Sequence, residues 1–252
     1  MICVHKNKSI GNVLFIVEGE KTEFSILRKV FCNILGYSFI GMNRRGYDTF
    51  IDNNNKNSRV AVINTKYSSI SSISGDEDYL DQVFDTLNTE YYFPIDKAAI
   101  YFLFDRDPES NTDSALIRNY IKHLQNPYDN ADYSRAGQIL LSYPSVEAFT
   151  ASAFIDGIEN LKFGTGKELK AYLSHKPEVQ LNKMSEEGIK KATDEFIRYV
   201  NECNESFDVD DFSETSITIF DREEKIYERS KVYDLFSMLM LAFLQLGIVE
   251  VV

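Results

Sequence analysis

The stretch that most limits how this chain can fold is an apolar run at residues 98–104, which ends at Asp105. Its apolar side chains do not alternate with polar ones, as they would on a strand with one face in water. Such a run is typical of a central strand in a parallel sheet that is covered on both faces. The coverage must come from helices, so the run predicts an α/β fold.

Other segments fit the same plan. Short apolar runs predict further strands at residues 12–17, 59–63 and 138–142. Apolar residues at helical spacing predict helices at residues 22–35, 76–87 and 113–125, the first of them ending at Gly36. Alternating strands and helices, with connections longer than a dozen residues, indicate a right-handed, doubly wound and mostly parallel sheet flanked by helices.

The rest of the chain has weaker patterns. Residues 37–58, rich in Gly, Asn and Arg, are expected to form a long connection, and residues 64–75 a loop. After residue 157 the pattern is mainly helical, with candidate helices at 166–173, 185–203 and 223–247. We therefore expect an α/β core over residues 1–157, and a helical extension over residues 158–252 that completes the core or forms a partner or subunit interface.

The composition favours a globular protein of the cytoplasm. The apolar fraction of 44% is enough for a folded core. The three cysteines form no CxxC pair, and the amino terminus lacks a secretory pattern, so we expect reduced thiols. Residues 235–249 carry no charge, but a membrane span needs about 20 apolar residues. A buried helix or a contact in a homo-oligomer is the expected role of this segment, and no membrane partner is expected.

The net charge of −12 argues against a nucleic-acid binder, because Lys and Arg supply most of the affinity for a polyphosphate. The charge is unevenly distributed, however, since residues 1–60 hold nine Lys and Arg against five acids. Lys21, Arg44 and Arg45 in this region are candidates for contacts with nucleic acid. A scatter of solvated charges is the alternative.

Acidic residues follow three of the predicted strands. Glu18 follows the first strand, Asp105 and Asp107 follow the central one, and Glu147 follows the strand at residues 138–142. The carboxyl ends of parallel strands meet at one edge of a sheet, where ligands bind. Two aspartates close together repel each other unless a cation lies between them, and Mg²⁺ prefers such oxygen ligands. A bound Mg²⁺ would neutralise charge that develops during attack on a phosphate.

Three motifs carry a resemblance to a known family. They are Val17-Glu-Gly-Glu-Lys-Thr-Glu23, Phe104-Asp-Arg-Asp107 and Tyr143-Pro-Ser-Val-Glu-Ala-Phe149. Over about residues 12–175 the chain resembles the Toprim domain of topoisomerases, primases and OLD-like nucleases. The resemblance is greatest to the small RloB-like and abortive-infection Toprim proteins of bacterial phage defence.

The resemblance implies a Rossmann-like sheet and a role for each motif residue. Glu18 is expected to act as general acid or base and to help bind the metal, while Asp105 and Asp107 are expected to bind Mg²⁺ or Mn²⁺. Further metal ligands are expected at Glu23 and Glu147. A late catalytic lysine that holds a phosphate is matched by either Lys167 or Lys170.

These expectations lead to a function. The chain is expected to be a Mg²⁺-dependent nuclease that cleaves DNA or RNA, including tRNA, as a toxic effector of antiviral defence. Proteins of this kind commonly work with an ATPase, and this chain has no ATP motif of its own. Its Gly164-Thr-Gly-Lys167 segment lacks the first glycine of a phosphate loop, because that position is Leu161.

The same acidic residues also fit roles without nuclease chemistry. Asp105 and Asp107 can form a turn before Pro108, and Glu18, Glu23 and Glu147 can each serve as an acidic residue in the first turn of a helix. A phosphatase of the HAD-like type would use Asp105 as nucleophile and Asp107 as acid, although Glu109 departs from its pattern. A module without catalysis would bind the metal structurally.

Overall fold

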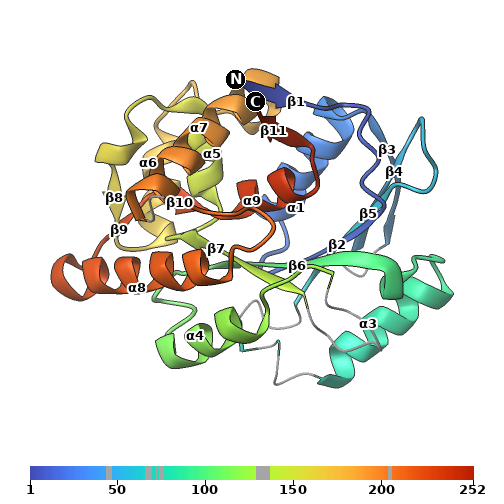
Figure 1. The fold of residues 1–252 in the computed structure, drawn as a ribbon, viewed down its shortest axis with the longest axis horizontal. Coiled ribbons are helices and arrows are strands. Elements are labelled where there is room, and N and C mark those ends of the chain that lie inside the picture. Colours follow the sequence, from blue (N-terminus) through green and yellow to red (C-terminus); the bar gives the residue numbers. More distant parts are fainter. Residues whose placement is uncertain (44–46, 66–69, 72, 74–76, 129–136, 204–205) are drawn as a thin grey trace. The chain divides into compact units, whose positions relative to one another are not determined.

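The computed structural model describes residues 1–43, 47–65, 70–71, 73, 77–128, 137–203 and 206–252 (Figure 1). These residues form two compact units, each assembled from separate stretches of chain. Unit 1 comprises Met1–His5, Phe104–Lys122 and Leu140–Val252, and unit 2 comprises Lys6–Leu103 and His123–Ile139. Residue 157, where the α/β core was expected to end, lies inside unit 1, which holds residues 140–252 together.

Unit 2 is built on a sheet whose central strand is β2 (Asn12–Val17). On one side β2 pairs in parallel with β5 (Arg59–Asn64), and on the other it pairs in parallel with β6 (Ala98–Asp105). The β2 residues from Val13 to Val17 are fully buried, as expected for a strand covered on both faces. The strands predicted from these apolar runs are thus confirmed.

Two more strands continue this sheet beyond β5. The strands β3 (Tyr37–Asn43) and β4 (Tyr47–Asp52) form an antiparallel pair, and β4 is antiparallel to β5, which gives the order β6-β2-β5-β4-β3. The prediction of a long connection at residues 37–58 was therefore wrong. The polar composition of residues 37–58 predicted a loop, although some of these polar residues lie on strands. Asp48, for example, is buried on β4, and its carboxylate is paired with Arg28 at 2.7 Å.

The helices of unit 2 follow the predicted pattern. The first is α1 (Thr22–Arg28), which continues as a π-helical stretch (Lys29–Ile34). It is followed by Gly36, whose positive φ of 77° is the left-handed conformation expected after a helix. The second is α3 (Glu77–Thr89). The aromatic rings of Phe15, Phe31, Phe50 and Tyr101 are fully buried in this unit.

Unit 1 contains the end of β6, most of β7 (Gln138–Tyr143), and the short strand β10 (Phe236–Ser237), which pairs antiparallel with β7. Directly after β6, the backbone N–H of Arg106 donates to the carbonyl oxygen of Ser142 on β7 at 2.8 Å. The strand pairs are thus mixed in direction: β2 runs parallel to β5 and β6, whereas the pairs β3–β4, β4–β5 and β7–β10 are antiparallel. The α/β class is confirmed.

Several helices surround these strands in unit 1. They are α4 (Ser114–His123), α5 (Glu147–Phe154), α6 (Gly166–Ser174), α7 (Glu186–Cys203), α8 (Ser213–Ser230) and α9 (Leu239–Gln245). The predicted helices at residues 113–125, 166–173 and 185–203 are confirmed as α4, α6 and α7. Helix α7 packs against both α5 and α8. Within the described residues, every helix is too short or too polar to span a lipid bilayer.

The predicted single helix at residues 223–247 was wrong. Helix α8 ends at Ser230 because Lys231 adopts a left-handed conformation, with φ of 59°. The strands β9 (Tyr233–Asp234) and β10 follow, and β9 pairs with β8 (Lys162–Phe163). Periodicity does not separate a short buried strand from a buried helix in a continuous apolar run. The uncharged segment is nonetheless buried, as expected, since Leu239, Leu241 and Phe243 have no exposed surface.

The first and last strands of unit 1 lie side by side (Figure 1). The strand β1 (Ile2–Val4) pairs antiparallel with β11 (Val249–Val251), and Ile2 lies opposite Val251. The backbone N–H of Val252 also donates to the carbonyl oxygen of Met1 at 2.8 Å. The two ends of unit 1 are therefore held by main-chain hydrogen bonds.

Candidate active site

The candidate site lies where β6 ends, at Asp105, and the chain turns toward Asp107. Each aspartate accepts a hydrogen bond from the backbone of a distant segment. The N–H of Val146 donates to Asp105 Oδ1 at 2.8 Å, and the N–H of Gly166 donates to Asp107 Oδ2 at 2.8 Å. Asp107 Oδ1 accepts a further bond, from the N–H of Glu109 at 3.0 Å. The turn after β6, the start of α5 and the start of α6 thus meet within unit 1.

The close approach of α6 explains the glycine at its first position. A Cβ atom on Gly166 would lie 2.9 Å from Asp107 Oδ2 and 2.9 Å from Ser145 Cβ, which are both closer than atoms in contact allow. Thr165 caps the same helix, because its side-chain oxygen accepts the N–H of Glu168 at 3.2 Å. The Gly164-Thr-Gly166 segment therefore brings a helix start against an aspartate.

A buried acid and a lysine complete the arrangement. Ser145 Oγ donates to Glu147 Oε2 at 2.8 Å, and Lys170 Nζ lies 3.4 Å from Glu147 Oε1. Ser145 and Glu147 are buried, whereas the side chain of Lys170 is 54% exposed. Lys167 is exposed and makes no hydrogen bond or ion pair with any residue that the structure describes. Of the two candidate lysines, Lys170 is the one paired with the predicted acid.

We call Asp105, Asp107, Ser145, Glu147 and Lys170 the carboxylate cluster. All five belong to unit 1. Asp105, Asp107, Glu147 and Lys170 were predicted from the sequence, and the structure links the segments that carry them. Ser145 lies within one of the three motifs, but its role in holding Glu147 could not be inferred from the sequence.

Arg106, which lies between the two aspartates, was not predicted from the sequence. Its side chain is 3% exposed, and its Nε and Nη2 atoms donate to the two carboxylate oxygens of Glu224 on α8, both at 2.8 Å. Its remaining Nη1 donates to the carbonyl oxygen of Asn111 at 2.8 Å, and Nη2 also donates to Ser114 Oγ at 2.7 Å. The positive charge of Arg106 is thus buried. Glu224 binds it through two hydrogen bonds, and the Asn111 carbonyl and Ser114 hydroxyl oxygens accept its other donors.

Asn111 was not predicted either, and it fixes the backbone of both aspartates. Its side-chain Nδ2 donates to the carbonyl oxygen of Asp105 at 2.7 Å, and its backbone N–H donates to the carbonyl oxygen of Asp107 at 2.9 Å. Asn111 is 2% exposed. The directions of the two carboxylates therefore depend on two sets of contacts. Asn111 holds the backbone of both aspartates, and the N–H groups of Val146 and Gly166 hold their carboxylates.

Helix α8 buries a second acid next to Glu224. Glu223 has no exposed surface, and it accepts hydrogen bonds from the Tyr199 hydroxyl and from the backbone N–H of Asp234, the latter at 3.1 Å. Burial raises the pKa of Glu223 to about 7, although the hydrogen bond from Tyr199 lowers it. This carboxyl group therefore keeps its proton at mildly acidic pH.

The remaining predicted residues belong to unit 2 or lie outside the described residues. Glu18 directly follows β2, is 7% exposed, and its backbone N–H donates to the carbonyl oxygen of Leu103 at 3.1 Å. Lys21 is exposed at the start of α1. Arg44 and Arg45 lie outside the described residues. The structure thus brings together the predicted residues of unit 1, while Glu18 belongs to the other unit.

Glu23 has a structural partner in unit 2. Its carboxylate accepts the backbone N–H of Gly19 at 2.9 Å, and a Cβ atom on Gly19 would lie only 2.6 Å from Glu23 Oε2. The Glu23 side chain thus closes the turn between β2 and α1, in the first turn of the helix, where a negative charge is favourable.

The chain was compared with protein-family models, curated proteins and solved structures. No protein-family model matches this chain, and neither a curated protein nor a solved structure matches it. Among the residues that the structure describes, no group of three or more His, Cys, Asp and Glu side chains is placed to hold a metal ion.

Proposed function

We propose that the carboxylate cluster is the centre of a Mg²⁺- or Mn²⁺-dependent nuclease that cleaves phosphodiester bonds in DNA or RNA. The observation that carries the proposal is the pair Asp105 and Asp107 at the end of a buried strand. Each carboxylate is oriented by a backbone N–H from another segment, at 2.8 Å in both cases. These hydrogen bonds fix the direction of each carboxylate, and carboxylate oxygens are ligands that Mg²⁺ prefers.

The donor set fits a magnesium site with few protein ligands. Mg²⁺ is usually held by one or two carboxylates and completes its shell with water and substrate phosphate oxygens. Asp105 and Asp107 would hold the ion, so a third protein carboxylate is not required. When bound, the ion would neutralise charge that develops on a phosphate.

The other residues of the cluster supply charge at a fixed position. Lys170 remains half exposed while its ammonium group lies 3.4 Å from Glu147, so it can reach a phosphate oxygen and still be held. Ser145 fixes Glu147 through the 2.8 Å hydrogen bond. We propose that Lys170 binds a phosphate of the substrate and that Glu147 orients it.

The sequence adds further parts to the proposal. The resemblance to Toprim nucleases of phage defence supports a toxic effector that acts with an ATPase. The uncharged segment at residues 235–249 adds the proposal of a homo-oligomer formed through the carboxy-terminal helices. The resemblance also supports Glu18 as general acid or base, while the excess of Lys and Arg in residues 1–60 supports Lys21 as a contact for nucleic acid. A partner would explain how a chain with a net charge of −12 attracts a polyanion.

Cleavage assays on the full chain test the proposal. Supercoiled plasmid DNA and tRNA are incubated with Mg²⁺ or Mn²⁺, or with EDTA. We expect metal-dependent cleavage that Asp105→Asn and Asp107→Asn each lower by roughly 100-fold or more, because a lost metal contact removes several kcal/mol of stabilisation. Asp105→Asn keeps an oxygen that can accept the N–H of Val146, so this variant should retain the turn. Asp107→Asn keeps an acceptor for only one of the N–H groups of Glu109 and Gly166, so Asp105→Asn is the cleaner test.

The matched control is Asp210→Asn, which removes one exposed carboxylate from the same unit. It should cleave at the wild-type rate, and unfolding by urea should show that the variants remain folded. Turnover of small phosphate esters without any cleavage of nucleic acid would favour the phosphatase and contradict the proposal. Glu18→Ala in the same assay tests the role that the resemblance implies for this residue.

A further inference from the structure

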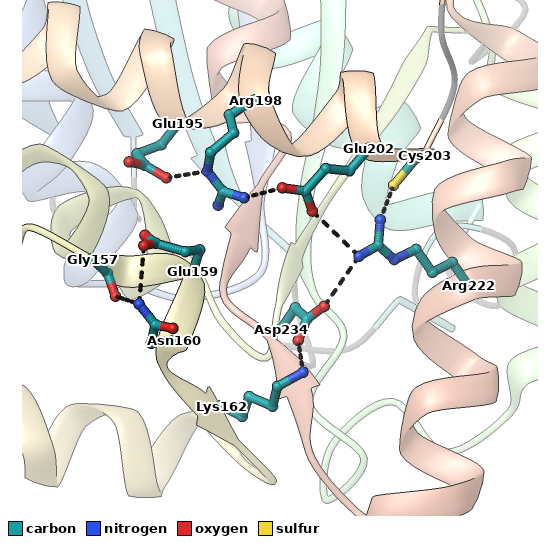
Figure 2. Close-up of polar contacts among 10 residues, drawn as sticks. All are labelled: Gly157, Glu159, Asn160, Lys162, Glu195, Arg198, Glu202, Cys203, Arg222 and Asp234. Atoms are coloured by element: carbon teal, nitrogen blue, oxygen red, sulfur yellow. Dashed lines mark hydrogen bonds and ion pairs between the residues drawn. The ribbon is translucent and has the colours of Figure 1, made fainter.

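A polar cavity of about 240 Å³ lies in unit 1, apart from the residues of the carboxylate cluster. Side chains of β8, α7, α8 and β9 line it, and Figure 2 shows how they face one another. Most of them are charged, and the ones that matter here are Lys162, Arg198, Glu202, Arg222 and Asp234.

Cations and carboxylates alternate along this lining. Glu202 Oε1 accepts a hydrogen bond from Arg198 Nη1 at 2.5 Å, and Glu202 Oε2 lies 3.5 Å from Arg222 Nη2. Asp234 Oδ2 lies 3.6 Å from the same Arg222 atom, and its other oxygen pairs with Lys162. Each carboxylate is therefore shared by two cations (Figure 2).

The two guanidinium groups are oriented by contacts on their other sides. Arg198 Nε donates to Glu195 at 3.0 Å, and Arg222 Nη1 donates to Cys203 Sγ at 3.1 Å. Arg222 also lies over the ring of Tyr199, with Cζ 5.0 Å from the ring centroid. Groups that are held before a ligand arrives lose less conformational entropy when it binds.

Both guanidinium groups nevertheless keep donors that no oxygen of the described residues satisfies well. Arg198 Nη2 has no hydrogen-bond acceptor among the described residues. The distances of 3.5 and 3.6 Å from Arg222 Nη2 to its carboxylates exceed the length of a charge-assisted hydrogen bond, about 2.7–2.9 Å. An oxyanion between the two guanidinium groups would supply the missing acceptors.

We propose that this cavity binds the phosphate group of a small phosphorylated molecule, which takes the place of the Glu202 carboxylate between Arg198 and Arg222. The Glu202 side chain is 48% exposed and lies in the last turn of α7, so it can turn toward water. A phosphate offers more charge and more acceptor oxygens to two guanidinium groups than one carboxylate does.

The other acids near the cavity limit where the phosphate lies. The Asp234 side chain is 15% exposed and stays paired with Lys162, while Glu195 holds the outer side of Arg198. Glu159 accepts a hydrogen bond from the Asn160 side chain at 2.9 Å. When Glu202 turns away, one carboxylate fewer lies beside Arg198 and Arg222. The phosphate then occupies the position that the Glu202 carboxylate held.

Calorimetric titration of the full chain tests this proposal. Inorganic phosphate and pyrophosphate are titrated at constant ionic strength in EDTA, so the result does not depend on a metal at the carboxylate cluster. Glu202→Gln should tighten binding roughly tenfold, because it removes the competing carboxylate. Arg198→Gln and Arg222→Gln should each weaken binding roughly tenfold or more.

Two exposed positions provide matched controls. Glu187→Gln on α7 and Arg229→Gln on α8 make the same charge changes away from the cavity, and both should bind as the wild type does. Equal binding by Arg222→Gln and Arg229→Gln, or no tightening in Glu202→Gln, would overturn the proposal. So would acetate binding as tightly as phosphate. Glu202→Gln changes a half-exposed side chain, so it keeps the test decisive even when an arginine variant fails to fold.

Discussion

Glu223 is the buried acid whose protonation the structure influences most clearly. It has no exposed surface, and burial raises its pKa from 4.5 to about 7. Between these two values the unfolded chain has lost the proton while the native protein still holds it. The native state therefore binds more protons in this range, and the free energy of unfolding falls as pH rises from about 4.5 to about 7.

Replacing Glu223 with glutamine should remove this pH dependence. Glutamine can accept the N–H of Asp234 and donate to the Tyr199 hydroxyl, so it resembles the protonated acid. Relative to the wild type, Glu223→Gln should gain about 1–3 kcal/mol of stability between pH 5 and pH 7. Urea unfolding at several pH values measures this difference. If the free energies of unfolding of Glu223→Gln and the wild type changed with pH in the same way, the prediction would be contradicted. Glu228→Gln, an exposed change on the same helix, is the control, and its free energy of unfolding should change with pH as that of the wild type does.

Single residues also show how far the sequence could predict the site. Asp105 and Asp107 were recognisable because they follow an uninterrupted apolar strand, and Glu147 because it opens a helix after another strand. The partner of Arg106 was not recognisable. Glu224 lies 118 positions further along the chain, and no local pattern links an arginine in a turn to a glutamate on a helix.

At the scale of elements, the turn after β6 and helix α8 are joined by the Arg106–Glu224 pair. Breaking a buried ion pair leaves one charge without a partner, which costs more than removing both charges. Glu224→Gln should therefore lower the free energy of unfolding by about 3–5 kcal/mol. The double variant Arg106→Met with Glu224→Met should lose less than this.

The same variants test whether the ion pair positions the aspartates. The double variant should remain folded but need more Mg²⁺ for half-maximal cleavage, because the turn that carries Asp105 and Asp107 is less constrained. Urea unfolding gives the stability, and a Mg²⁺ titration of cleavage gives the second quantity. An unchanged Mg²⁺ requirement would show that the pair serves stability alone.

The elements that were predicted correctly are those with a strong apolar period and clear ends. Strand β6 and helix α7 are of this kind. The hairpin of β3 and β4 was missed because it buries acids such as Asp48, whose partner Arg28 lies on another element. The end of α8 was missed because it depends on a left-handed lysine, Lys231, where glycine is the usual residue.

At the scale of the whole molecule, unit 1 is assembled from three stretches of the chain. A fragment of residues 1–157 would keep Asp107 and α5 but lose Gly166, α7 and α8. We expect this fragment to lack the cooperative unfolding transition of unit 1, because α5 packs on α7 and Arg106 needs Glu224. Circular dichroism during urea unfolding checks this. A sharp transition with native-like stability would show that residues 1–157 fold independently.

The pairing of β1 with β11 bears on the order of events during folding. This ladder joins residues at opposite ends of the chain, and closing so long a loop costs on the order of 5 kcal/mol of chain entropy when nothing else has formed. Strands of three residues each cannot offset that cost alone. We therefore expect the β1–β11 ladder to form late in folding, after the helices between the two strands have packed and brought the ends of unit 1 together.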